Sequence, residues 1–226
     1  MVVRTSMKIA AIQIGMPQTY HDLDAKSGRT SDWTTAIFKE TIEGPVWATK
    51  TGLRGDGQAD RRFHGGPDKA INAYCLAHYP YWTSELGLDA MPMGSFGENL
   101  TIRDAVEADV CVGDIFEVGD AVLQISQPRQ PCGTLARRWR TPDLARRIEK
   151  NGMTGWYFRV LDEGDLMAGD VFKRIERPHP KWTVAEANEV MHHRRKDYAA
   201  ARELAALPPL AASWKEALER RAAGKE

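Results

Sequence analysis

Short apolar and β-branched runs, separated by glycines and polar turns, fill the first three quarters of the chain. Residues 8–15 and 46–52 each form such a run and end on a glycine, which predicts two strands. The intervening residues 16–44 are mostly polar, and we expect them to form a long excursion. This pattern favours a mainly β protein with inserted helices.

Two later segments have the pattern strand, turn, strand. Residues 115–118 and 122–125 flank Gly119-Asp120, which predicts a hairpin. Residues 156–161 and 171–175 flank two turn signals and predict another unit of the same kind. Many short strands punctuated by turns favour a closed or nearly closed β architecture.

Two helices are expected inside the β-rich part. One runs from Tyr79 to Leu86. The other covers residues 142–150, where Thr141 can cap the helix, a proline suits its first turn and Gly152 ends it.

After residue 178 the β pattern disappears and alanines become frequent. Thr183–Glu186 and Ser213–Glu216 match the capping box that opens helices. A middle helix is expected around residues 197–206, and two consecutive prolines separate it from the last one. We therefore predict a main domain over residues 1–178 and a three-helix extension over residues 179–226.

The overall charge and hydropathy exclude several classes of partner. The chain has 226 residues, with 31 basic and 31 acidic side chains and 42% hydrophobic residues. No net field favours nucleic acid or a membrane surface, and no apolar run reaches membrane-spanning length. The first residues do not form a secretory signal, so we expect a cytoplasmic protein.

Three widely spaced cysteines fit neither a disulfide framework nor a paired zinc motif. Cys132 follows a predicted strand, with two prolines and Arg129 before it and Gly133 after it. A nearby cation favours the thiolate, which can ligate a soft metal, attack a substrate or carry a persulfide. It could equally be a small buried hydrophobe. Cys75 and Cys111 lie in apolar strands and are expected in the core.

The segment 54–69 concentrates charged residues, one histidine and four glycines between apparent strands. Glycines let backbone amides approach a ligand, and basic side chains bind anions through charge-assisted hydrogen bonds. An anionic cofactor would fit this chemistry, although a solvated turn would have the same composition. Six arginines between residues 129 and 147 could rim an anionic cleft or contact nucleic acid, but a solvated helix face explains them better.

Several separated motifs together resemble the MOSC-domain family, and their order and spacing match it. They are Gly55–Asp60, His64–Lys69, Phe96–Leu100, Gly113–Phe116, Gln127–Cys132 and Gly169-Asp170. The tail from Ser213 to Lys225 is similar to the three-helix extension of the stand-alone bacterial, YiiM-type branch.

This resemblance implies a MOSC β-barrel-like domain, followed by a small C-terminal three-helix domain, that binds the pyranopterin molybdenum cofactor (molybdopterin). Cys132 matches the metal-ligating cysteine and, with His64, is the expected catalytic pair. The sequence departs from the family at Gly133, where a bulky residue is expected. The residues expected to contact the cofactor are Arg54, Asp60, His64, Asp68, Lys69, Asn99, Gln127 and Arg129.

The activity implied by the resemblance is the reduction of N-hydroxylated purine bases, amidoximes or hydroxylamines, which would be detoxifying. No flavin, nicotinamide or iron–sulfur motif occurs, so a separate electron-donating reductase is expected as a partner. Two alternatives stay open: sulfur carriage by a persulfide on Cys132, and a non-catalytic module that binds a pterin or nucleotide. The tail could mediate a homodimer or dock the reductase.

Overall fold

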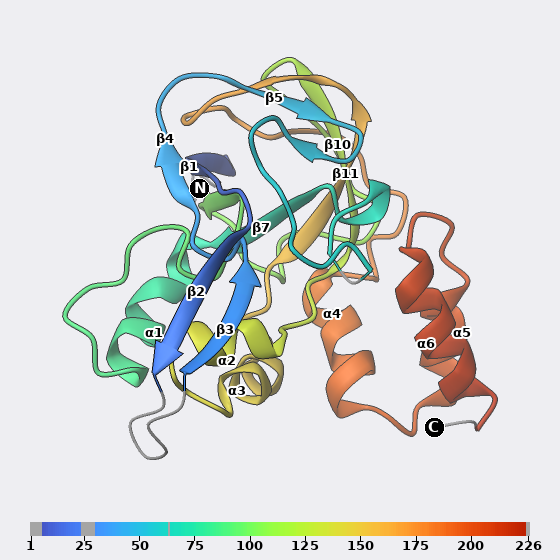
Figure 1. Ribbon diagram of the computed structural model, residues 1–226. Helices are drawn as coiled ribbons and strands as arrows, with labels where there is room; N and C mark the ends of the chain where they lie inside the picture. The colour runs from blue at the N-terminus through green and yellow to red at the C-terminus, as the bar shows by residue number, and fades with distance from the viewer. Residues whose placement is uncertain (1–5, 24–29, 63, 225–226) are drawn as a thin grey trace.

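A large curled sheet forms the body of the protein, with helices gathered below it in the view of Figure 1. This computed structural model describes residues 6–23, 30–62 and 64–224. Neighbouring strands are antiparallel except β7 and β8, which run parallel. From edge to edge the eight strands are β13 (Lys173–Glu176), β9 (Ile115–Val118), β10 (Ala121–Pro128), β11 (Trp156–Asp162), β7 (Ile71–Cys75), β8 (Leu100–Arg103), β1 (Lys8–Ile14) and β4 (Glu40–Ile42).

The start of β1, near one edge of this sheet, contacts the segment just before β13, the strand at the other edge. Lys8 forms an isolated antiparallel bridge with Val171, just before β13. The Ile9 amide donates to the Asp170 carbonyl at 3.0 Å, and the Phe172 amide donates to the Met7 carbonyl at 2.9 Å. The sheet is therefore a half-barrel, which confirms the predicted β-rich, barrel-like class.

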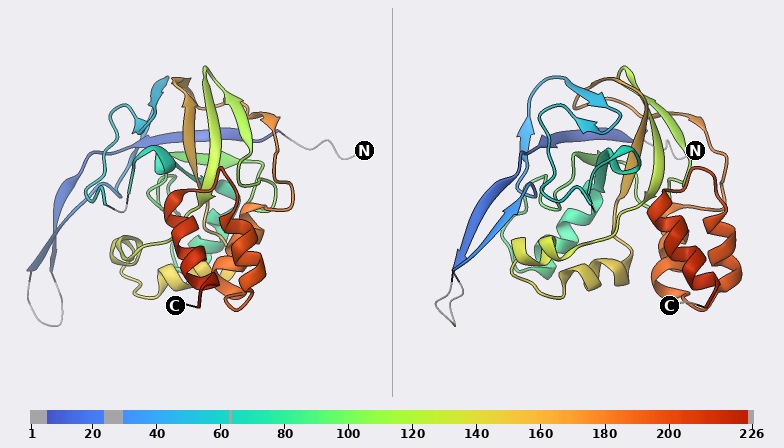
Figure 2. Two further views of the ribbon diagram at one scale, coloured as in Figure 1. Left: turned by 90° about the vertical axis from the view of Figure 1, so that its right-hand side faces the viewer. Right: turned by 45° about the vertical axis from the view of Figure 1, so that its right-hand side comes forward.

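The polar stretch 16–44, expected to form a long excursion, includes regular strands. It contains β2 (Gln18–Leu23) and β3 (Thr30–Thr35), a hairpin that projects from the body in Figure 2, followed by β4. Opposed pairs such as Thr19 with Thr34 and Tyr20 with Trp33 suit a strand pair. The hairpin shows no apolar alternation, because neither of its faces is buried deeply in the core.

The segment 156–175 does not form the predicted local unit. β11 pairs with β10 and β7, whereas β13 pairs with β9. Between them, β12 (Gly164–Leu166) pairs with β5 (Val46–Thr49), which continues to β6 (Gly52–Leu53) in a small three-stranded sheet. The 115–125 hairpin is confirmed as β9 and β10. Tertiary pairing with distant strands overrides the local turn signals.

Three helices pack beside the half-barrel. α1 (Tyr79–Glu85) and α3 (Leu144–Asn151) confirm the two predicted helices, and Gly152 ends α3 in the left-handed conformation, with φ of 70°. The predicted cap was wrong: Asp143 holds the cap position, and the Thr141 hydroxyl donates to the Trp139 carbonyl instead. The short helix α2 (Gly133–Arg138) was not predicted.

The C-terminal region contains α4 (Val184–Asn188), a π-helical turn (Glu189–His193), α5 (Tyr198–Ala205) and α6 (Ala212–Ala222). Thr183 caps α4 by accepting from the Glu186 amide, as predicted. The second capping box was wrong, because α6 begins at Ala212, one residue before Ser213. The helices enclose a separate apolar core that includes Trp182, Leu204, Leu210, Trp214 and Leu218.

The half-barrel has its own apolar core, drawn from both ends of the sheet and centred on residues such as Ile12, Ile71, Leu123 and Phe158. A third cluster under α1 stacks Tyr74 on Phe96, with ring centroids 4.1 Å apart. Among the described residues, no helix has both the length and the apolar character needed to cross a membrane.

Candidate functional site

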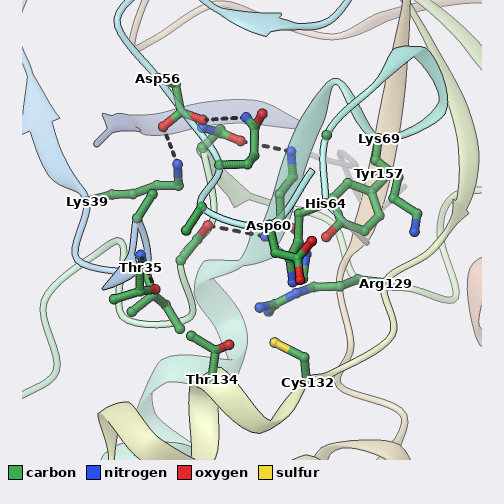
Figure 3. A pocket seen from close by; sticks show the side chains of 18 of the residues that line it. Thr35, Lys39, Asp56, Asp60, His64, Lys69, Arg129, Cys132, Thr134 and Tyr157 are labelled. Carbon is green, nitrogen blue, oxygen red and sulfur yellow. Dashed lines mark hydrogen bonds and ion pairs between the residues drawn. The ribbon is translucent and has the colours of Figure 1, made fainter. Parts of the chain in front are cut away.

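Five separated segments of chain and Tyr157 surround a cavity of about 490 Å³. Figure 3 shows Cys132 and Thr134 on one side of it and Lys39 and Asp56 on the other. The lining comes from residues 34–39, 56–65, 69–72, 96–99 and 127–134. Of the nine residues predicted for the site, seven line this cavity: Asp60, His64, Lys69, Asn99, Gln127, Arg129 and Cys132.

The half-buried Cys132 thiol lies where β10 ends and α2 begins. Burial by itself raises its pKa, but hydrogen bonding to His64, the charge of Arg129 and hydrogen bonding to Thr134 outweigh burial and lower the pKa to about 6. The group is therefore mostly thiolate at neutral pH. Cys75 and Cys111 are buried, as predicted, and burial raises the pKa of both thiols.

Arg129 brings a buried cation into the cavity, with only 5% of its surface exposed. Its amide donates to the Gly155 carbonyl at 3.1 Å, and its Nη2 donates to the Phe96 carbonyl at 2.7 Å. Its Nη1 has no hydrogen-bond partner within the described part of the chain. A buried guanidinium nitrogen without a partner is costly, so this position favours an anionic or hydrogen-bond-accepting ligand.

The 54–69 loop supplies Asp60, His64 and Lys69 to the same cavity. Asp60 shapes the turn: its carboxylate pairs with Arg62, and its carbonyl accepts from the His64 amide at 3.1 Å. Hydrogen bonds from Arg62 lower the Asp60 pKa to about 2. Burial lowers the pKa of Lys69. The loop thus places one imidazole near the thiolate and contributes one ammonium group to the lining of the same cavity.

Asn99 and Gln127 form walls whose side chains already have partners. Asn99 Oδ1 accepts from the Asn72 amide at 3.1 Å, and its Nδ2 donates to the Gln13 carbonyl at 3.2 Å. Gln127 Nε2 donates to the Pro128 carbonyl at 2.9 Å. Asn72 differs from both, because its buried Oδ1 has no hydrogen-bond partner among the described residues. The sequence pointed to Asn99, yet Asn72 is the amide with capacity left for a ligand.

The structure does not bring Arg54 and Asp68 to the cavity wall. The exposed Arg54 guanidinium lies 6.0 Å from the Trp47 ring centroid. The Asp68 carboxylate points to Arg159, at 2.5 Å, and to the Ala212 amide, at 3.1 Å. Both residues belong to the segment 54–69 that was predicted to bind the cofactor. Some side chains of this segment line the cavity, whereas those of Arg54 and Asp68 contact other parts of the protein.

A buried ion pair at the far side of the cavity was not singled out from the sequence. Lys39 pairs with Asp56, and their side chains are 7% and 2% exposed. Asp56 Oδ1 also accepts from the Gly15 amide at 2.9 Å, and burial lowers the Lys39 pKa. The pair fixes the 34–39 segment against the 54–69 loop, so it sets the width of the cavity.

Gly97 and Gly65 allow two close approaches at the cavity wall. Both adopt left-handed backbone, with φ of 72° and 77°. A Cβ atom at Gly97 would lie 2.9 Å from an Ile37 side-chain carbon, and one at Gly65 would lie 2.6 Å from Gln58 Oε1. Glycine is required at both positions for conformation as well as for space. An added Cβ at Gly133 would meet nothing within 4 Å.

The arginine-rich segment 129–147 is not a uniform solvated face. Arg137 binds the projecting hairpin: its Nε donates to Asp22 at 2.7 Å, and its guanidinium lies 4.5 Å from the Trp33 ring centroid. Arg138 donates to the Ile37 and Gly94 carbonyls at 2.6 and 2.8 Å. Helix α2 therefore anchors the 34–39 wall through side chains that follow Cys132 closely in sequence.

A second polar cluster lies outside the cavity. His78 Nε2 lies 2.7 Å from Glu107 Oε2, Cys75 Sγ donates to the same carboxylate at 3.7 Å, and the Gly155 amide donates to Glu107 Oε1 at 2.7 Å. These three side chains are all buried and could together ligate a metal. The carboxylate, however, has enough donors without one, so the cluster is explained as a structural hydrogen-bond network.

Two family models match the chain. A MOSC-domain model matches residues 60–173, and a model described as a YiiM-like, 3-alpha helix domain matches residues 182–224. The first range contains most of the cavity lining and Cys132, and the second contains the C-terminal core.

Curated relatives cover most of the chain. Protein YflK of Bacillus subtilis is 36% identical over 92% of this chain and 90% of its own length. Protein YiiM of Escherichia coli is 35% identical over 83% and 84%. A protein named reductase from Gibberella moniliformis is 39% identical over 71% of this chain, a match that spans 29% of that longer protein.

Solved structures show the same fold. The crystal structure of YiiM from Geobacillus stearothermophilus superposes with a TM-score of 0.79 and is 37% identical, covering 96% of this chain and 99% of that one. The crystal structure of YiiM from Escherichia coli has a TM-score of 0.74 at 30% identity, covering 84% and 90%.

Proposed function

The chain belongs to the MOSC-domain family, in its YiiM-like branch, and from this we propose that it is a molybdenum-cofactor-dependent reductase of N-hydroxylated compounds. MOSC domains generally bind the molybdenum cofactor. The observation that carries the proposal is the Cys132 thiol, which faces the cavity with its pKa lowered to about 6. A thiolate is a soft ligand suited to a sulfur-rich metal site.

The residues around the cavity fit such a cofactor. Arg129 Nη1 and Asn72 Oδ1 are buried polar atoms with no partner in the described chain, and they match the acceptors and donors of a pterin or phosphate. Lys69 adds a further cation to the lining. We therefore assign metal ligation to Cys132 and binding of the anionic cofactor to Arg129, Lys69, Asn72 and His64, with Asp60 shaping the loop.

When bound, the cofactor would supply the two electrons that remove oxygen from an N–OH group. The reaction converts R–NH–OH, two electrons and two protons into R–NH2 and water. His64, which lines the cavity and helps to lower the Cys132 pKa, can hold a proton beside the reacting centre. The buried Arg129 lowers the local cost of negative charge. Tyr157 and Phe96 close the cavity wall and exclude water.

The electrons would come from a separate flavin or iron–sulfur reductase, as expected from the motifs that the sequence lacks. Substrates would be N-hydroxylated purine bases, amidoximes or hydroxylamines. The matching Gibberella protein carries the name reductase, and the region similar to this chain spans only part of it. That similarity supports an oxidoreductase role and leaves the substrate as a proposal.

The test is to produce the protein in a host that makes the cofactor, alongside Cys132→Ser and Cys111→Ser as a matched control cysteine. Molybdenum content is measured by mass spectrometry, and reduction of N-hydroxylaminopurine with a chemical electron donor is assayed in the same preparations. We expect molybdenum and turnover in the wild type and in Cys111→Ser, and loss of both in Cys132→Ser. Absence of molybdenum from every preparation would refute the proposal.

The low-pKa thiolate also supports sulfur carriage as a second candidate. In that case the purified protein would carry sulfane sulfur on Cys132 and no molybdenum. A non-catalytic pterin-binding module would instead retain ligand affinity in Cys132→Ser, with no turnover in either protein.

A further inference from the structure

The start of α6 lies against the back of the wall that carries Arg129. The Ala211 amide donates to the Ser126 carbonyl at 2.9 Å, and the Ser213 hydroxyl donates to Gln127 Oε1 at 3.3 Å. Ser126 and Gln127 lie near the end of β10, which finishes at Pro128 just before Arg129, and both are fully buried. The views in Figures 1 and 2 show the three-helix group standing beside the half-barrel.

The same helix start also holds the loop that carries Lys69. Asp68 Oδ2 accepts from the Ala212 amide at 3.1 Å, and Asp68 Oδ1 accepts from Arg159. The Asp68 carbonyl accepts from the Ser126 hydroxyl at 2.5 Å, which links the loop directly to β10. Two pocket segments, 64–69 and 126–129, are thereby joined to each other and to one helix terminus.

Arg159 completes this connection from β11. Its Nη1 donates to Gln124 Oε1 at 2.6 Å and to the Pro209 carbonyl at 3.3 Å, while its other nitrogens bind Asp68. One guanidinium thus contacts β10, the 64–69 loop and the segment that leads into α6. A planar guanidinium with five N–H donors holds its partners in fixed directions, whereas a lysine ammonium binds as a flexible point charge.

We propose that the C-terminal three-helix domain is a positioning element of the cavity, in which Asp68 and Ser213 are positioning residues that hold the Lys69 loop and the Arg129 strand in place. This inference deepens the proposed function, on which it rests for the identity of the ligand. Neither residue lines the cavity. They act on the placement of Lys69, Gln127 and Arg129 in the cavity wall through the contacts of the α6 start, and the Cys132 thiol in the same cavity serves as the reporter of that placement.

The experiment measures the thiolate of Cys132 in the full-length chain purified from cells that cannot make the cofactor. Iodoacetamide alkylation of Cys132 is followed by peptide mass spectrometry between pH 4.5 and 9 in wild type, Asp68→Ala, Asp68→Asn and Ser213→Ala. We expect the pKa of Cys132 to rise by about one unit in Asp68→Ala, so that alkylation at pH 6 slows about fivefold. Ser213→Ala should shift it less, in the same direction.

The sign of the shift separates positioning from a simple charge effect. Removing the negative charge of Asp68 would by itself lower the pKa of a nearby thiol, because the thiolate would be less repelled. A rise therefore reports displacement of His64 or Arg129. Asp68→Asn can still accept from the Ala212 amide and should fall between wild type and Asp68→Ala.

The matched control is Asp197→Ala, which removes the side chain that caps α5 by accepting from the Ala200 amide. This variant should lower the thermal unfolding midpoint and leave the Cys132 pKa unchanged. An unchanged pKa in Asp68→Ala, or an equal rise in Asp197→Ala, would overturn the proposal. The readout needs no molybdenum, so it stands apart from the test of the reductase activity.

Discussion

The lowered pKa of Cys132 makes the stability of the fold depend on pH in a predictable way. The pKa falls from an ordinary 9.0 to about 6 on folding. Between these values the unfolded thiol is protonated and the folded one is ionised, so stability rises with pH. Each unit is worth about 1.4 kcal/mol, which gives a total of about 4 kcal/mol above pH 9. The contribution disappears as pH falls through 6.

The assay is urea unfolding of wild type and Cys132→Ser, each without cofactor and in reducing buffer, at pH 5.5, 7 and 8. Serine does not ionise in this range, so the difference between the two free energies of unfolding isolates the thiolate. Relative to pH 5.5, we expect this difference to grow by about 1 kcal/mol at pH 7 and by about 2.5 kcal/mol at pH 8.

His64→Gln refines the test, because His64 is the strongest of the three stabilising partners of the thiolate. In the His64→Gln protein the pKa of the folded Cys132 thiol is higher. The difference in free energy of unfolding between this protein and the same protein with Cys132→Ser added therefore begins to grow at a higher pH. Parallel stability curves for wild type and Cys132→Ser would refute the reasoning, since they would mean that folding leaves the thiol pKa unchanged.

Three further changes have expected outcomes. Lys39→Met leaves the buried Asp56 carboxylate unpaired and should cost about 3–5 kcal/mol in urea unfolding; a loss below about 1 kcal/mol would contradict the role of the pair. Gly133→Ala meets open space at the start of α2 and should stabilise by about 0.5 kcal/mol without changing molybdenum content. Thr183→Ala removes the cap that accepts from the Glu186 amide and should lower stability by about 1 kcal/mol, seen as a lower thermal midpoint.

Local chemistry made part of the site predictable from the sequence. Cys132 stands out because prolines, a glycine and a nearby arginine surround it within one short segment. His64 and Lys69 belong to a loop whose glycines and charges are equally local. The structure brings all three to one cavity. Local turn, capping and periodicity signals likewise predicted the 115–125 hairpin, α1, α3 and the C-terminal helices, because these signals act between residues close in sequence.

Long-range contacts explain what the sequence left unpredicted. Lys39 and Asp56 form a buried ion pair only when the 34–39 segment packs on the 54–69 loop. The pairing of β13 with β9 rather than β11 depends on the curl of the whole sheet. Ser213 was expected to cap α6, but the cap position is held by Ala211, two residues earlier.

That two-residue difference has the same origin as the role of Asp68. A capping box at Ser213 would satisfy the first amides of the last helix locally. Instead, the Ala211 and Ala212 amides donate to Ser126 and Asp68, on the wall and loop of the cavity. The amides at the start of α6 therefore donate to residues of the cavity wall and loop rather than to a local cap. Asp68 resembles a ligand-binding residue in the sequence because it lies in the loop that lines the cavity. In the structure its carboxylate instead connects this loop to the start of α6.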